Sequence, residues 1–277
     1  MKYIFALLFS FSLPLFLLGQ QVAVSENEMR IAVLFDSLKV SSSDSEKKEI
    51  NSRIIKLFTE ELQDPASFAK PYSSLNFVGK ISSDDGKVKI YTWNYPLSDK
   101  THGYGGFIQY RIRSKTIKTI PLTIKTEAYV PFNTRRILPN KDWYGALYYK
   151  IARVRYKKET YYLVLGWARA NAASEFKVIE MLNFDDKGNA TFGKGLGVLK
   201  YKHKTLQRFV LEYNADAKIS LTYNEKTKRI VFDHLAPTEP VYTNVYSHYG
   251  PNFTYDSFVF QKGKWVFEGN VDVRNKD

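Results

Sequence analysis

The chain has 277 residues, a formal net charge of +13 at pH 7, and 44% hydrophobic residues, among them 20 Tyr and 19 Phe. This length is enough to bury one large core or two modest ones, and the aromatic content excludes a disordered chain. Cysteine is absent, which excludes disulfides, thiolate metal sites and a cysteine nucleophile.

Residues 1–20 have the pattern of an export signal. Lys2 supplies the positive charge, residues 3–18 form an apolar run, and Gly19 is a small residue suited to the position before a cleavage site. The alternative is an uncleaved membrane anchor, but the run is short for a spanning helix and Pro14 interrupts it. Export without disulfides indicates a bacterial protein that is periplasmic, displayed at the cell surface or secreted.

Residues 21–70 form a predicted helical segment, which a Ser-rich break at residues 40–44 divides in two. Ser43 followed by Glu46 is a capping-box pattern that begins the second helix, and Pro65 lies beyond its end. The second helix has one apolar face, made of Ile50, Ile54, Leu57, Phe58 and Leu62. An apolar face must be covered, so we expect this segment to pack on the rest of the chain. The alternative is a helix that binds a partner.

From Leu75 onward the apolar residues alternate with polar ones, as in strands. Hairpins are predicted at residues 77–93 and 104–124, and a loop with two prolines at residues 129–142. Further strands are predicted at residues 176–184, 209–213, 219–223 and 230–232, and a last hairpin at 258–267.

The hairpin within residues 143–167 is the most apolar part of the chain. Residues 161–167 are apolar or aromatic at nearly every position, which predicts a strand buried on both faces. In the partner strand the apolar phase changes near Ile151 and Ala152, which predicts a β-bulge there.

These patterns predict a mainly β domain over residues 71–277, built as an antiparallel meander of roughly 12–15 strands. The two N-terminal helices are expected to pack on it. A sandwich, a barrel and a propeller-like closure all fit the pattern.

Catalytic candidates lie in the C-terminal third, where two histidines and two carboxylates occur within a short stretch. They are Asp233, His234, His248 and Asp256. Such groups serve as acid–base pairs or metal ligands, whereas the structural alternative is a histidine bonded to turn backbone. No histidine pair stands at short ligand spacing, so we predict no metal site and no cofactor. Serine-hydrolase and phosphate-loop motifs do not occur.

Ligand-binding candidates are the aromatic residues near predicted strand ends, where Tyr and Trp stack on sugars or peptides, or else fill a wide core. They are Trp93, Tyr104, Trp143, Tyr144 and Trp167, and His102 is added because it begins the Gly-rich string at residues 102–106, where glycines bring backbone close to a ligand or form a turn.

Several strings resemble those of a group of exported bacterial β-rich proteins with no assigned activity. They are Tyr-Tyr-Leu-Val-Leu-Gly-Trp at residues 161–167, Arg-Phe-Val-Leu-Glu-Tyr at 208–213, Ile-Val-Phe-Asp-His-Leu-Ala-Pro at 230–237 and Tyr-Gly-Pro-Asn-Phe-Thr-Tyr-Asp at 249–256. The resemblance covers residues 75–267. It implies export and a single β-rich unit, and it transfers no catalytic residue.

The leading hypothesis is an exported, non-catalytic β-rich protein that acts as a binding or assembly component. The candidate partners are an envelope glycan, an anionic surface or another envelope protein, and no specific nucleic acid is expected. One alternative is a hydrolase or metal-dependent enzyme that uses the Asp/His residues. A second alternative is a basic protein that binds polyanions, for which binding should fall steeply with added salt.

Overall fold

The computed structural model describes residues 24–114, 116–124, 134–169, 171–193 and 197–272. The predicted export signal at residues 1–20 lies outside the described residues, as does part of the predicted loop at 129–142. Within the described part the protein is mainly β, with two N-terminal helices, as predicted.

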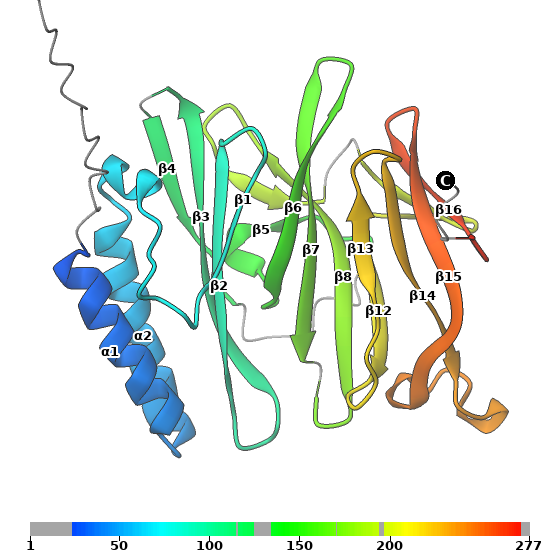
Figure 1. Cartoon of the computed structure of the whole chain (residues 1–277), viewed down its shortest axis with the longest axis horizontal. Helices are drawn as coiled ribbons and strands as arrows, with labels where there is room; N and C mark the ends of the chain where they lie inside the picture. Colours follow the sequence, from blue (N-terminus) through cyan, green and yellow to red (C-terminus); the bar gives the residue numbers. More distant parts are fainter. Residues whose placement is uncertain (1–23, 115, 125–133, 170, 194–196, 273–277) are drawn as a thin grey trace, which may run out of the picture.

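The elements stack in four layers (Figure 1). A helix pair covers a first sheet, which we call the helix-side sheet. The central sheet follows, and the outer sheet lies on its far side. Three apolar clusters fill the three spaces between these layers. Of the three closures considered, this layered arrangement fits the sandwich, because among the described residues each sheet runs from one edge strand to another.

The first layer consists of α1 (Glu26–Val40) and α2 (Asp44–Glu61). The Ser43 side chain accepts a hydrogen bond from the Glu46 amide at 3.4 Å, so α2 begins at the predicted cap. It ends before Pro65, which opens the 3₁₀ helix η1 (Pro65–Ala69).

The buried faces of both helices pack on aromatic residues of the helix-side sheet. Phe58 stacks on Trp93 with ring centroids 5.2 Å apart, and the Trp93 indole donates to Asn51 Oδ1 at 2.7 Å. This contact confirms the expectation that the helical segment packs on the β-rich part. It also fixes α2 on the sheet, because a buried indole N–H needs a partner.

The helix-side sheet has the order β1-β2-β3-β4 and contains the two predicted hairpins. Its strands are β1 (Gly79–Ser82), β2 (Val88–Pro96), β3 (His102–Arg113) and β4 (Thr116–Pro121).

The central sheet has the order β5-β9-β8-β7-β6, and β12 also pairs with β8. Its strands are β5 (Leu138–Pro139), β6 (Leu147–Tyr156), β7 (Glu159–Arg169), β8 (Ser174–Phe184), β9 (Ala190–Phe192) and β12 (Arg208–Asn214). Along β7, Tyr162 and Val164 join the cluster facing the helix-side sheet, whereas Leu163 and Leu165 join the cluster facing the outer sheet. The prediction that this strand is buried on both faces is confirmed.

The bulge in β6 lies two residues earlier than predicted. The register with β7 shifts between Tyr148 and Lys150, so the extra residue is Tyr149. The insertion lets Tyr148 and Ile151 face the same apolar cluster although their numbers differ in parity. Tyr149 is pushed outward, and its hydroxyl donates to the Leu221 carbonyl at 3.1 Å.

The outer sheet has the order β11-β10-β16-β15-β14-β13. Its strands are β10 (Leu199–Tyr201), β11 (Lys204–Leu206), β13 (Leu221–Asn224), β14 (Arg229–Pro237), β15 (Tyr249–Gln261) and β16 (Lys264–Glu268). Three short 3₁₀ helices interrupt the connections: η2 (Asn140–Asp142), η3 (Pro240–Tyr242) and η4 (Tyr246–His248). Three features depart from a simple meander, since β10 and β16 pair in parallel, β12 joins the central sheet, and β5 pairs with β9 at the edge opposite β6.

The double coverage of β7 gives a stability prediction. Leu163→Ala should lower the free energy of unfolding by about 2–5 kcal/mol, because the lost side chain leaves a cavity between two packed sheets. The control Val33→Ala, at an exposed helical position, should change it by less than about 0.5 kcal/mol. Urea denaturation of both variants measures the difference. A cost below about 1 kcal/mol for Leu163→Ala would contradict burial of β7 between two sheets.

Candidate functional site

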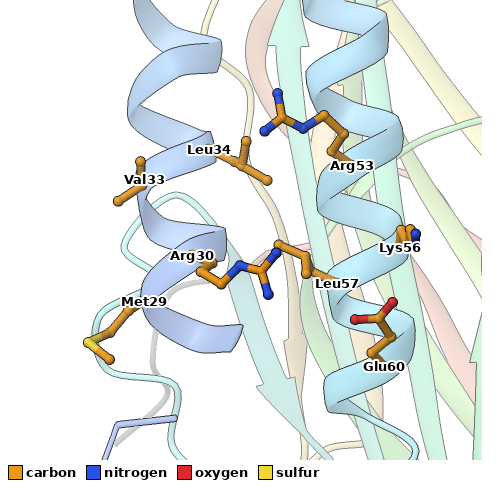
Figure 2. Close-up of a pocket in the computed structure, with 8 residues that line it drawn as sticks. All are labelled: Met29, Arg30, Val33, Leu34, Arg53, Lys56, Leu57 and Glu60. Carbon is orange, nitrogen blue, oxygen red and sulfur yellow. The ribbon is translucent and has the colours of Figure 1, made fainter. Parts of the chain in front are cut away.

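A groove lies between α1 and α2, on the side of the helix pair that is open to solvent (Figure 2). The cavity has a volume of about 460 Å³, within the roughly 300–1,000 Å³ of known ligand pockets. Four apolar, three basic and one acidic residue line it: Met29, Val33, Leu34, Leu57, Arg30, Arg53, Lys56 and Glu60.

Positive charge gathers around this groove. Figure 2 shows the side chains of Arg30 and Arg53 extending from opposite helices into the space between them. Among the described residues, no carboxylate oxygen lies within 4.0 Å of a side-chain nitrogen of Arg30, Arg53 or Lys56. Glu60 is the only acidic side chain in the lining. Figure 2 shows Leu34, Leu57 and Glu60 in the same space, so two arginines and one glutamate lie around a small apolar surface between the helices.

An apolar row on α1 continues the groove lining along the helix. Met29, Val33 and Val40 are 52%, 64% and 81% exposed. Their spacing of four and seven residues places them on one face. The opposite face of α1 buries Ile31, Leu34, Phe35 and Leu38. Asp36 is exposed on the same face between Val33 and Val40, so this side of α1 carries three exposed apolar side chains and one acid, and the described part of this chain leaves it uncovered.

His234 and Asp256 come together on the outer sheet. The register between β14 and β15 shifts at His234, and its Nδ1 lies 2.7 Å from Asp256 Oδ2. Asp256 also accepts from the Asn270 amide at 3.1 Å, so its carboxylate is fixed. A neutral imidazole held this way donates from Nδ1 and leaves Nε2 for other contacts.

The side chains of the other two catalytic candidates make their contacts elsewhere. Asp233 Oδ2 accepts from the Ser220 amide at 2.6 Å, which ties the start of β13 to β14. The His248 ring stacks on Tyr242 at 3.9 Å between centroids, in the connection between β14 and β15. In the described part of the chain, no three His, Asp or Glu side chains are grouped to hold a metal ion.

Three of the aromatic ligand candidates lie within the packed layers. Trp93 and Trp143 are fully buried, and the Trp143 indole donates to the Tyr148 hydroxyl at 3.1 Å. The Tyr144 hydroxyl donates to Glu180 at 2.6 Å. These contacts account for the two tryptophans as members of the interior and for Tyr144 as a partly buried side chain packed against it.

Tyr144 belongs to a buried network around an ion pair of the central sheet. Glu180 and Arg208 are both 0% exposed, with Oε1 and Nε 2.6 Å apart. Tyr144 and Tyr148 both donate to Glu180 Oε2, at 2.6 and 2.9 Å. Burial and the nearby Glu180 charge hold the pKa of both phenols well above the ordinary value. The phenols are therefore fixed donors to the carboxylate.

The remaining three aromatic candidates meet at one edge between the helix-side and central sheets. The His102 and Trp167 rings are 6.0 Å apart, and the Tyr104 hydroxyl accepts from the Arg169 amide at 2.8 Å. Glu175 accepts from the Trp167 indole at 2.8 Å and pairs with Arg169 at 2.7 Å. This edge is polar and partly exposed, but its donors and acceptors largely satisfy one another.

Comparisons with protein-family models, with curated proteins and with solved structures found no match. Within the described residues, no helix is both long enough and apolar enough to cross a membrane.

The helix groove is a site that sequence reasoning missed. The basic residues of α1 and α2 have, in the sequence, the pattern of an ordinary solvated helix face. One feature of the sequence could have indicated the groove. Met29 and Val33 are apolar, yet they lie outside the face of α1 that packs on the sheet.

The edge cluster gives a pH prediction. Burial, and secondarily the Arg169 charge, lowers the pKa of His102 below its ordinary value, although Glu175 partly opposes this. Asn94 Nδ2 lies 2.5 Å from His102 Nδ1, an arrangement in which neutral imidazole accepts from the amide. The unfolded chain therefore binds the proton more readily, so the stability contribution of His102 is present above about pH 6.5 and lost as the pH falls below it.

Urea denaturation at pH 7.5 and pH 5.5 tests this. His102→Gln should reduce the loss of unfolding free energy on acidification, whereas the exposed control His203→Gln should leave it as in the wild type. An unchanged loss in His102→Gln would contradict a neutral His102.

Proposed function

We propose that the protein is an exported, non-catalytic β-rich protein that binds an acidic amphipathic helix of another envelope protein in the groove between α1 and α2. The observation that carries this proposal is that Arg30 and Arg53 extend from the two helices into one groove whose lining is otherwise mostly apolar. Helix-in-groove recognition uses this chemistry: apolar anchors enter the groove, and charges at its rim set orientation and partner choice.

The shape of the apolar surface favours a helix over a small ligand. Exposed apolar side chains continue beyond the cavity toward the end of α1, where Val40 lies on the same face as Met29 and Val33, with Asp36 between. Met29 and Val40 are eleven residue steps apart, a span of about 16 Å at 1.5 Å per residue. A partner helix lying along α1 would cover the whole row, whereas a compact ligand would leave Val40 in water.

The alternatives have less support. The hydrolase alternative rests on the His234–Asp256 pair, which has the geometry of a general base and its orienting carboxylate. In the described residues no serine or threonine hydroxyl hydrogen-bonds to the His234 ring. The polyanion alternative accounts for the cations of the groove, but gives no role to its apolar lining.

A synthetic peptide tests the groove. The probe is an amphipathic helix with leucines at i, i+3, i+4 and i+7 and glutamates along the borders of that face. We expect saturable binding by fluorescence anisotropy, and Arg53→Glu should weaken it about tenfold, because it places like charges together. Lys48→Glu, an equal charge change on α2 outside the cavity lining, should have little effect.

Three outcomes would contradict the proposal. The first is equal binding of a peptide with the same composition but scattered leucines. The second is equal binding of polyphosphate, which would support the polyanion alternative. The third is a stable homodimer in light scattering that buries Met29 and Val33 and excludes the peptide, because the groove would then hold a second copy of this chain.

Export is tested with a fusion. Residues 1–20 joined to a reporter enzyme that is active only outside the cytoplasm should give activity in a bacterial host. Replacing the apolar run with a polar one should abolish it. Full activity of the altered fusion, or a reporter retained in the cytoplasm, would contradict export.

A further inference from the structure

A second cavity, of about 280 Å³, lies where the helix-side sheet meets the central sheet, near the turn between β6 and β7. Arg153 pairs with Tyr162 across these strands, and Arg155 pairs with Thr160, so the four side chains share one face. Lys87 from the β1–β2 turn also lines the cavity. The cavity is the point at which the apolar layer between the two sheets gives way to polar residues.

The inner wall of the cavity is aromatic. Tyr110 and Phe184 stack in parallel, with centroids 3.8 Å apart and planes 6° apart. Tyr162 meets Phe184 edge to face at 5.9 Å. All three rings pack against the same buried cluster, so the wall is fixed before any ligand arrives.

The rim of the cavity is basic. Arg153 lies 3.8 Å from carboxylate oxygens of both Asp84 and Asp85. In the described residues, Lys87 and Arg155 have no carboxylate oxygen within 4.0 Å of their side-chain nitrogens. Both are exposed and belong to the cavity lining.

The one acidic side chain of the lining is already engaged. Asp85 accepts from the Ser83 hydroxyl at 2.6 Å, from the Lys87 amide at 3.1 Å and from the Tyr162 hydroxyl at 3.0 Å. Its carboxylate therefore holds the turn and offers little to a ligand. Hydrogen-bond donors dominate what remains in the cavity, namely the side chains of Lys87, Arg155, Thr160 and Tyr110.

We propose that this cavity binds one acidic sugar unit, a hexuronate residue of an anionic glycan. The carboxylate lies against Arg155 and Lys87, because a guanidinium matches carboxylate geometry and forms strong charge-assisted hydrogen bonds. The C–H face of the pyranose lies on the aromatic wall. The volume is slightly below the roughly 300–1,000 Å³ of pockets that hold drug-sized ligands, which suits a single ring.

The site is separate from the helix groove, since no residue lines both cavities. Its failure would leave the peptide-binding proposal untouched, and charge changes at Arg53 should not alter binding of the sugar.

The experiment is an NMR titration of the mature protein with methyl glucuronide, with methyl glucoside and sodium sulfate as controls. We expect saturable shifts of cavity amides with the glucuronide, and binding at least about tenfold weaker for the neutral sugar, which lacks the charge-assisted contact. If the glucoside binds equally well, the basic rim has no role and the proposal fails. If sulfate binds equally well, the aromatic wall has no role, and the ligand is a simple anion rather than a sugar.

Matched variants keep the result independent of folding. Arg155→Gln removes an exposed cation and should weaken glucuronide binding about threefold to fivefold. Lys158→Gln removes a cation from the adjoining turn, outside the lining, and should bind as the wild type. Tyr110→Phe retains the stacked ring and serves as a second, fold-preserving probe of the hydroxyl. Glucuronide binding by Arg155→Gln as tight as by the wild type would overturn the assignment, and so would the absence of saturable shifts at Lys87 and Thr160 in the wild type.

Discussion

Both faces of the central sheet are covered, and the rest of the structure depends on this constraint. Strand β7 contributes alternate side chains to two separate apolar clusters, one against the helix-side sheet and one against the outer sheet. The middle of β7 therefore presents neither face to solvent, and among the described strands of the central sheet the exposed side chains lie toward edges and turns, as on β6. Binding surfaces are left at the outer layers and at the open ends of the spaces between sheets. The helix groove lies on an outer layer, and the second cavity lies at one such end.

Charged residues inside a sheet that is covered on both faces need a partner of opposite charge, and Glu180 and Arg208 form such a pair. The two residues stand directly opposite each other in the register of β8 and β12. Breaking such a pair costs several kcal/mol, because one charge would remain buried alone. A shift of β12 by one residue would move Arg208 away from Glu180. The two tyrosines that donate to Glu180 would stay with the carboxylate, so they would not restore a partner for Arg208. The network therefore fixes the register of the strand that departs from the meander.

The features predicted correctly from the sequence are those that depend on residues close together in the chain. The apolar run of residues 161–167 indicated burial on both faces, and Ser43 with Glu46 located the start of α2. The pairing of β12 with β8 was not predictable, because it depends on contacts between distant segments. For the same reason His234 and Asp256 could be named as candidates, but alternation of apolar and polar residues could not show that these two meet. Their contact requires a register shift at His234, which alternation alone does not indicate. Both cavities were missed, since each draws its lining from more than one element.

Charge alone would not make either cavity selective. Exposed ion pairs contribute roughly 0–1 kcal/mol and weaken in salt, so the cations of a chain with net charge +13 attract any anion weakly. Apolar contact contributes about 25 cal/mol for each Å² removed from water, and it depends on shape rather than on net charge. In the groove this contact comes from Met29, Val33 and Leu57, and in the second cavity from Tyr110 and Phe184. The cations then orient a ligand that the apolar surface has selected. Each site therefore discriminates between ligands of equal charge by the shape of their apolar part.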